Sequence, residues 1–193
     1  ISESGIANDL YKMFHVLFGG LKGGLAIGTM FMMVAISAMN GLSVAGMAIG
    51  ATIALPEMLK RNYDKRMITG VVQAGSSLGI LIPPSVVMVL YGMIARQPVS
   101  KLWMAGILPG LLMASLFLIY IYVRCKLQPE LGPPLKKSER NYSTVEKIKL
   151  LKAGIIPFVI FFFMTGLFLM GIASLVECSA VGAFLATLAS IYK

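Results

Sequence analysis

Long stretches without a charged residue divide this chain. They cover residues 23–56, 67–95, 102–123, 153–176 and 178–192. An α-helix needs about 20 consecutive apolar residues to cross the hydrocarbon core of a bilayer. The runs at 102–123 and 153–176 fit that length and predict ordinary transmembrane helices. The first two runs are longer, and each is interrupted near its centre.

The first run, residues 23–56, is too long for one upright helix. Its centre is the polar, glycine-containing sequence NGLS at residues 40–43. Two full spans would each be shorter than the ~20 residues that a bilayer requires. The pattern therefore favours a re-entrant helical hairpin, which enters the membrane and returns to the same side. Irregular backbone at its tip is tolerated only where protein or a water-filled cavity satisfies the polar groups.

The second run, residues 67–95, contains two consecutive prolines, Pro83 and Pro84. A proline removes a backbone donor and disfavours helical geometry in the residue before it. We therefore expect a helix that breaks at mid-membrane, with halves near residues 67–74 and 85–95. Two interrupted elements in succession are the best sequence indication of a midplane site for an ion and a substrate.

Composition agrees with a membrane protein. Of the 193 residues, 58% are hydrophobic and 13% are charged, and the mean hydropathy is +0.84. Soluble domains carry roughly 25% charged residues, so the predicted fold class is an all-α polytopic membrane protein. The net charge of +9 does not indicate a nucleic-acid partner, because no basic run is interleaved with aromatic residues as a nucleic-acid groove requires.

Basic residues set the expected orientation. They gather in segments 57–66 and 124–152, and the excess of Lys and Arg in cytoplasmic loops places both segments inside. The short loop at residues 96–101 then lies outside. Residues 9–18 mix apolar with polar positions and predict an amphipathic interfacial helix.

Neither end of the chain reads as a natural terminus. The start lacks the basic n-region and apolar h-region of a signal peptide, and the last residues, 190–193, continue an apolar stretch. We therefore expect a piece of a longer protein. Its parts would be a lead-in segment, a hairpin, a broken helix with the following span, a cytoplasmic linker and the start of a second repeat, at residues 1–22, 23–56, 57–123, 124–152 and 153–193.

Candidate chemistry lies at the two interruptions. Oxygen atoms at the hairpin tip come from Ser37, Asn40 and Ser43. Small and hydroxyl residues at the break are Gly75, Ser76, Ser77, Gly79 and Ser85. Carbonyl ends of half-helices coordinate cations, and half-helix N-termini attract anionic groups. The simpler alternative is that the tip is a loop between two thin spans and that the break is a kink that serves packing.

Other functional classes find little support in the sequence. The single histidine, His15, lies outside the apolar runs, so an intramembrane hydrolase would lack its base. We predict no enzyme activity and no catalytic residue. Cys125 and Cys178 border different spans and predict neither a metal site nor a disulfide framework. Glu177 either marks the outer interface or serves as a functional intramembrane acid.

Four stretches resemble the large membrane subunit, the M or DctM-like subunit, of tripartite ATP-independent periplasmic (TRAP) transporters. They read SAMNGLSVA, GATIALPEMLKRNYD, GSSLGILIPPS and LWMAGILPGLL, at residues 37–45, 50–64, 75–85 and 102–112. The alanine–leucine–proline–glutamate sequence with the basic turn after it, within residues 50–64, and the run from glycine to the two prolines, within residues 75–85, are together specific for this family. The resemblance covers nearly the whole chain. The family's common tip, serine-glycine-serine-serine, differs here because Asn40 and Leu42 replace two hydroxyl residues.

The resemblance implies an elevator mechanism, in which a transport domain with re-entrant hairpins and broken helices slides against a scaffold in the bacterial inner membrane. Sodium as the coupling ion would enter with an organic acid such as a C4-dicarboxylate or a sialic acid. A periplasmic substrate-binding protein would deliver the substrate, and a small membrane subunit would complete the scaffold. Family members are considerably longer, so this chain would hold one inverted repeat and the beginning of the next.

The resemblance also implies a sodium site between the tip and the break. It maps onto Asn40, Gly41, Ser43, Gly75, Gly79, Ile82 and Pro83. Weaker candidates for substrate binding are the hydroxyl groups of Ser37, Ser76, Ser77 and Ser85. No cofactor and no metal other than sodium is expected. The alternatives are a single-component sodium/carboxylate symporter of related fold and a non-transporting membrane scaffold.

Overall fold

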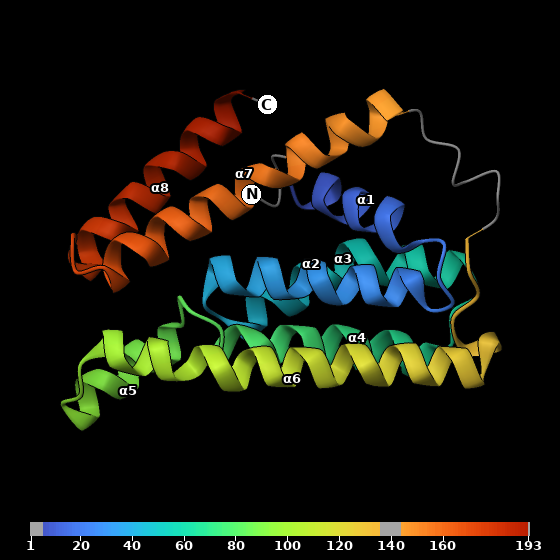
Figure 1. Ribbon diagram of the computed structural model, residues 1–193, viewed down its shortest axis with the longest axis horizontal. Coiled ribbons are helices and arrows are strands. Elements are labelled where there is room, and N and C mark those ends of the chain that lie inside the picture. Colours follow the sequence, from blue (N-terminus) through green and yellow to red (C-terminus); the bar gives the residue numbers. More distant parts are fainter. Residues whose placement is uncertain (1–5, 136–143, 193) are drawn as a thin grey trace.

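The computed structural model describes residues 6–135 and 144–192, which form helices and connecting turns (Figure 1). The elements are α1 (Ile6–Phe18), α2 (Gly24–Asn40), α3 (Ser43–Lys60), α4 (Lys65–Ser77), η1 (Leu78–Ile80), α5 (Val86–Ala95), α6 (Val99–Leu127), η2 (Pro129–Leu131), α7 (Thr144–Leu169) and α8 (Leu175–Tyr192). No strand occurs in these two ranges. The all-helical class predicted from the sequence is confirmed for the described chain.

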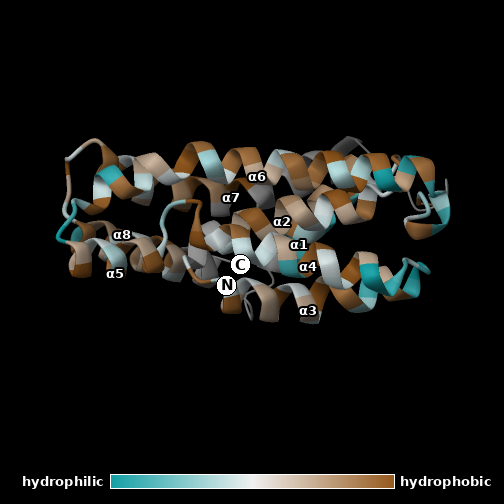
Figure 2. Cartoon of the chain, turned by 90° about the horizontal axis from the view of Figure 1, so that it is seen from below, coloured by the Kyte–Doolittle hydropathy of each residue, from teal (hydrophilic) through white to brown (hydrophobic). Residues whose placement is uncertain are grey.

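The helices α2, α3, α4 and α6 lie along the long axis of the molecule (Figures 1 and 2). α2 is central and packs against α1, α3, α4 and α6. α7 packs on α1 and α2, and α8 folds back along α7. The α2 side chains Met30, Met32 and Met33 are almost completely buried. Protein covers most of this helix, as expected for a helix that is apolar all round, and Phe31, Val34 and Ala35 on one face are partly buried.

The first apolar run forms a helical hairpin. α2 ends at Asn40, and α3 begins at Ser43. Gly41 has left-handed geometry, with φ 64° and ψ 7°, and its N–H donates to the Ser37 carbonyl at 2.8 Å. Glycine in this conformation commonly terminates an α-helix. Leu42 is extended, and the chain reverses at the residues where the sequence placed the tip.

The second apolar run is interrupted as the two prolines predict. η1 separates α4 from α5, and α5 begins only after Ser85. The first half is longer than expected, because α4 starts at Lys65, outside the apolar run. Asp64 caps this start: one carboxylate oxygen accepts from the N–H groups of Arg66 and Met67 at 3.0 and 3.1 Å. Such a cap satisfies N–H groups that have no partner inside the helix.

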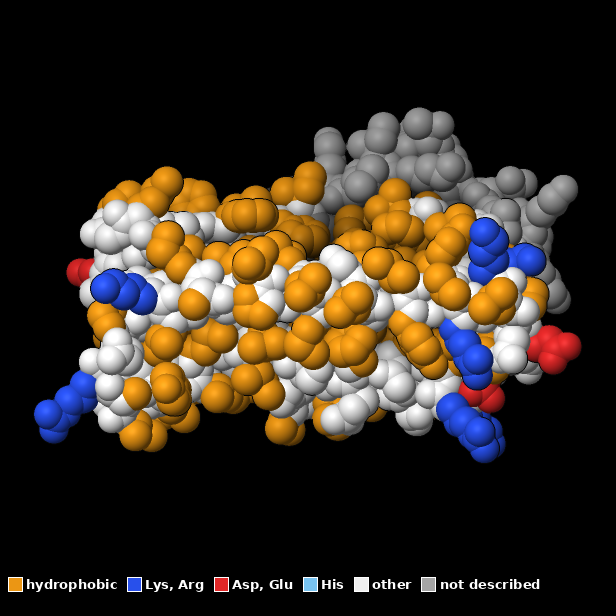
Figure 3. All heavy atoms as spheres, turned by 60° about the horizontal axis from the view of Figure 1, so that its bottom comes forward, with side chains coloured by type: hydrophobic (Ala, Val, Ile, Leu, Met, Phe, Trp, Pro, Cys, Tyr) orange, Lys and Arg blue, Asp and Glu red, His pale blue; other side chains and the backbone are white. Residues whose placement is uncertain are grey.

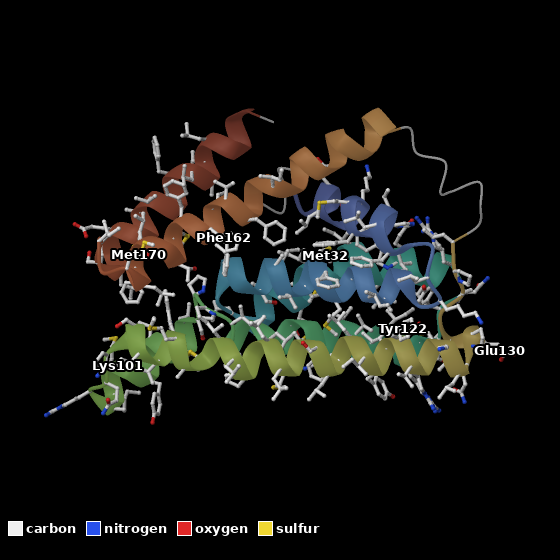
Figure 4. The ribbon with its side chains drawn as sticks, in the orientation of Figure 1. Met32, Lys101, Tyr122, Glu130, Phe162 and Met170 are labelled. Atoms are coloured by element: carbon white, nitrogen blue, oxygen red, sulfur yellow. The ribbon has the colours of Figure 1, made fainter. Side chains whose placement is uncertain are left out.

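Among the described residues, α6 is the helix that is long and apolar enough to cross a membrane, and several shorter helices are apolar. Large apolar side chains are exposed along it. Hydrophilic residues gather toward the ends of the molecule, with an apolar band between them (Figures 2 and 3). Lys101 and Glu130 lie at these opposite ends (Figure 4). Extensive exposed apolar surface is typical of a protein that contacts lipid or further protein.

The run at residues 153–176 is not one continuous span, which corrects the expectation from the sequence. α7 ends at Leu169 and α8 starts at Leu175. The Glu177 carboxylate accepts from the Ser174 N–H at 2.7 Å and from the Ser174 hydroxyl at 2.8 Å. The Ser174 hydroxyl accepts from the Glu177 N–H at 3.3 Å. This reciprocal capping box fixes the start of α8 and gives Glu177 a local structural role.

The lead-in helix α1 has the two faces that its sequence predicts. Its buried face packs on α2, where the rings of Phe14 and Phe18 stack on Phe31 with centroids 5.6 and 5.0 Å apart. Lys12 is exposed on the other side. The structure has a helix at these residues, and the place of this segment at a membrane interface stays a prediction.

The polar segment that follows α6 packs against the entrance of the hairpin. Backbone hydrogen bonds of 2.8–3.2 Å run from Gly23 N–H to Gly132 O, from Asp64 N–H to Leu131 O and from Leu135 N–H to Gly19 O. They tie the α1–α2 turn, the α3–α4 turn and the end of α6 together. The expected linker is therefore part of the fold up to residue 135, and residues 136–143 lie outside the described chain.

Candidate ion and substrate site

The hairpin tip and the break in the second run touch each other. The N–H of Val86, the first residue of α5, donates to the Gly41 carbonyl at 3.2 Å. A Cβ atom added to Gly41 would lie 2.7 Å from the Pro84 carbonyl oxygen. Glycine is required at this point both for its left-handed backbone and for the close approach. The structure thus brings together two interruptions that lie far apart in the sequence.

Ser37 lies inside this contact. Its side chain is 0% exposed, and its hydroxyl group has no hydrogen-bond partner among the described residues. A Cβ atom on Gly46 of α3 would lie 2.5 Å from the Ser37 Oγ, and one on Gly79 of η1 would lie 2.7 Å from the Ser37 Cβ. An unpaired buried hydroxyl group costs roughly 1–3 kcal/mol, so this position would favour a polar ligand.

The serines of the break bond to their own backbone. The hydroxyl groups of Ser76 and Ser77 donate to carbonyls three residues earlier, at 2.9 and 2.8 Å. Ser85 donates to the Ile80 carbonyl at 2.6 Å and accepts from the Met88 N–H at 3.3 Å. Ser85 is therefore the N-cap of α5. These bonds match the structural alternative for serines near helix ends, in which the side chain serves the local backbone.

The other candidates at the break lie behind the contact. Gly75 packs on α2, because a Cβ atom there would lie 2.5 Å from the Met33 Cβ. Ile82 and Pro83 are buried, and a Cβ atom on Gly110 of α6 would lie 2.9 Å from the Ile82 Cγ1. Gly79 is therefore the candidate glycine of the break that reaches the tip, whereas Gly75 lets α4 approach α2.

Three helix ends converge at the contact: the C-terminal end of α2 and the N-terminal ends of α3 and α5. A helix C-terminus presents carbonyl oxygens with partial negative charge, and an N-terminus carries partial positive charge. Ser43 opens α3 and is half-buried. The side chain of Asn40 lies outside what the structure describes. The arrangement therefore sets an end suited to a cation beside two ends suited to an anion.

Sequence reasoning missed Trp103 of α6. Its indole N–H donates to the Ser85 carbonyl at 3.3 Å, and its ring centroid lies 4.8 Å from that of Phe168 on α7. A buried indole N–H needs an acceptor. Trp103 is the only tryptophan of the chain, and this was the one feature of the sequence that could have singled it out. Together with Gly41, Trp103 lines a pocket of about 320 Å³ that reaches Cys178 of α8.

Comparison with known proteins identifies the family. The model of the family described as "Tripartite ATP-independent periplasmic transporter, DctM component" matches residues 1–192. The chain belongs to this DctM family. The description of this family, like the names of the relatives, is that of a transporter component and not of an enzyme. The resemblance drawn from its hairpin tip and double-proline run is confirmed.

Curated relatives of this DctM chain carry different substrate names. The "C4-dicarboxylate TRAP transporter large permease protein DctM" of Pseudomonas aeruginosa is 34% identical over 128 residues, which are 66% of this chain and 30% of the relative. The "Ectoine TRAP transporter large permease protein TeaC" of Halomonas elongata is 33% identical over 117 residues, 61% of this chain and 27% of the relative. The "2,3-diketo-L-gulonate TRAP transporter large permease protein YiaN" of Escherichia coli is 29% identical over 188 residues, which are 96% of this chain and 42% of the relative. The chain thus spans less than half the length of these relatives.

Proposed function

We propose that this chain is part of the large permease subunit of a TRAP transporter that takes up an organic acid together with sodium. The observation that carries the proposal is the contact of the hairpin tip with the break, through the Gly41 carbonyl and the Val86 N–H. Paired broken elements that meet are the usual place of ion and substrate sites in secondary transporters.

Sodium is proposed to bind between the tip and the break. The ligands would come from Asn40, Gly41 and Ser43 at the tip and from the backbone near Gly79, Ile82 and Pro83. Carbonyl oxygens at the end of α2 suit a cation, and the Ser37 hydroxyl adds a buried oxygen without a partner in the described chain. Gly75 would serve the site indirectly, through the packing of α4 on α2.

The substrate acid is proposed to bind in the pocket of about 320 Å³ beside the tip. The N-terminal end of α5 lies at this pocket and favours negative charge. Ser85 lines it from the break, whereas Ser76 and Ser77 are weaker candidates because they bond to their own helix. A C4-dicarboxylate is the proposed class, since several relatives carry that name.

The hairpin is proposed to be re-entrant and to form part of an elevator-type transport domain. α2 and α3 have 17 and 18 residues, or about 26 Å at 1.5 Å per residue. α6 has 29 residues, or about 44 Å, and the tip meets the break partway along it. This geometry suits a hairpin that enters and leaves at the end where α6 finishes.

The whole transporter is proposed to lie in the bacterial inner membrane and to work with a periplasmic substrate-binding protein and a small membrane subunit. The family description, which names a tripartite and periplasmic system, supports this proposal. The apolar faces of α5 and α6 would then contact lipid or the remaining parts of the transporter.

The proposal is tested with the full-length transporter, reconstituted in vesicles with its partner proteins. Uptake of a C4-dicarboxylate is measured as a function of sodium concentration. We expect the double variant Asn40→Ala/Ser43→Ala to need more sodium for half-maximal uptake, because two oxygen donors are lost. Ser115→Ala is the control, since Ser115 lies on α6 and bonds only to its own helix in the described chain. Unchanged sodium activation in the double variant would contradict the sodium site.

A further inference from the structure

A second cavity lies away from the hairpin tip, between α4 and α6. Its volume is about 810 Å³, and α2 contributes Met30 to it. α4 and α6 both lie below α2 in Figure 1 and flank it in the view of Figure 2, so α2 lies at the back of the gap between them. The apolar lining includes Met67, Val71, Ala74, Leu116, Phe117 and Ile121. This cavity, which we name the α4–α6 groove, shares no residue with the pocket beside the tip.

One end of the α4–α6 groove is basic. Arg66 and Arg124 line it and are exposed, and no ion pair joins either guanidinium group to a described residue. Asp64 also lines this end, but one of its carboxylate oxygens already accepts from two N–H groups of α4. Gln128 is neutral. The two guanidinium groups therefore outnumber the single carboxylate at this end, and the resulting positive charge favours an anionic group there.

The other end of the groove lies deeper in the apolar band. Each wall of the groove is about 12 Å long, at 1.5 Å per residue. The α4 wall runs from Arg66 to Ala74, and the α6 wall runs from Arg124 to Leu116. Half of a typical hydrocarbon core is about 15 Å. The basic end lies where the α3–α4 turn meets the segment after α6 through the hydrogen bond from Asp64 N–H to Leu131 O, the level expected for a cytoplasmic head-group region. The groove thus has the depth of about one leaflet.

We propose that the α4–α6 groove binds one anionic phospholipid. The phosphate lies between Arg66 and Arg124, and an acyl chain follows the apolar walls. The planar guanidinium group matches phosphate oxygens with two parallel hydrogen bonds, and basic pockets between membrane helices bind anionic lipid head groups. The site is separate from the proposed sodium and substrate positions and does not depend on them.

The charge requirement is tested on the purified full-length transporter in detergent. Native mass spectrometry measures retention and affinity of phosphatidylglycerol, with phosphatidylcholine as the neutral comparison. We expect a preference for phosphatidylglycerol and a loss of about fivefold for each of Arg66→Gln and Arg124→Gln, which corresponds to the contribution of one basic residue near an anionic lipid. The controls Lys65→Gln and Lys126→Gln, made one at a time, each remove the same single charge from a neighbouring position that does not line the groove.

The position of the acyl chain is tested with Gly70→Leu. A Cβ atom at Gly70, which lines the groove on α4, would meet nothing within 4 Å, so a leucine side chain there starts in open space and takes up part of the groove. Gly166→Leu on α7 is the matched control, because that glycine also faces open space. We expect only Gly70→Leu to displace phosphatidylglycerol.

Three results would overturn the proposal. Equal losses in the arginine and lysine variants would mean a general attraction of anionic lipid to this end. Unchanged binding in Gly70→Leu would place the acyl chain elsewhere. No preference for phosphatidylglycerol in the full-length transporter would mean that the groove does not select an anionic head group.

Discussion

At the scale of single residues, the contact inside the hairpin depends on the absence of side chains around Ser37. Gly46 and Gly79 approach it from α3 and η1, where added Cβ atoms would come within 2.5–2.7 Å of the serine side chain. The resemblance paired Gly79 with the hairpin tip, but the sequence did not indicate that Gly79 packs against Ser37, and it offered no reason to select Gly46. It also could not separate Ser37 from Ser76, because hydrogen bonding to the preceding turn is possible for both. Of these two serines, Ser76 makes that bond and Ser37 does not in the described chain.

We expect Gly79→Ala to destabilise the transporter. The new methyl group would overlap the Ser37 Cβ in a packed interior, and such overpacking typically costs about 1–3 kcal/mol. Thermal unfolding of the full-length protein measures the loss. Gly70→Ala is the control, because a Cβ atom there meets nothing within 4 Å and alanine favours the helix by up to about 1 kcal/mol.

A double-mutant cycle isolates the Ser37–Gly79 contact. Ser37→Gly removes the Cβ atom that the new methyl group would meet, so the combination with Gly79→Ala should cost less than the sum of the two single changes. Residues in direct contact commonly show such coupling. Strictly additive losses would mean that the two positions do not touch.

At the scale of elements, the existence of the interruptions followed from the sequence, whereas several boundaries did not. Two consecutive prolines and a glycine-containing tip are local signals that end a helix, and their effect does not depend on what the helix packs against. The extension of α4 back to Lys65 and the division between α7 and α8 depend on polar side chains that cap helix ends, Asp64 and Ser174. Hydropathy alone does not distinguish a continuous apolar helix from two helices joined by a short apolar turn.

The capping box at the start of α8 gives a local prediction. We expect Ser174→Ala to loosen the first turn of α8, because it removes the hydroxyl group that accepts from the Glu177 N–H and donates to the carboxylate. Loss of an N-cap typically costs about 0.5–2 kcal/mol. Hydrogen exchange of residues 175–178 should become faster. Ser179→Ala is the control, since Ser179 donates to a carbonyl inside the same helix; equal effects of both changes would argue against the cap.

At the scale of the whole molecule, the charged ends and the apolar band define two sides. The α3–α4 turn, the entrance of the hairpin and the end of α6 lie together at one end. The α5–α6 turn lies at the other end (Figure 1). The basic residues of segments 57–66 and 124–128 favour the cytoplasm for the first end. The sequence predicted which loops share a side, because the prediction for each loop needs only the charges of that loop.

Thiol labelling in whole cells tests the orientation. With a reagent that does not cross the inner membrane, Gln97→Cys in the α5–α6 turn should be labelled, whereas Lys22→Cys and Lys60→Cys at the hairpin entrance should be protected. All three positions are exposed. The native Cys125 and Cys178 are buried and should contribute little background. Labelling of Lys22→Cys or Lys60→Cys from outside would show that the hairpin does not enter and leave on the cytoplasmic side.

The sequence by itself determined the helical class, the hairpin, the break near Pro83 and the family, because hydropathy, proline geometry and short motifs are properties of neighbouring residues. Only the tertiary structure decided that the Gly41 carbonyl meets the Val86 N–H and that Trp103 bonds to the Ser85 carbonyl. It also decided that Arg66 and Arg124 share one groove. These contacts join segments far apart along the chain, and they depend on how helices pack, which no local pattern specifies.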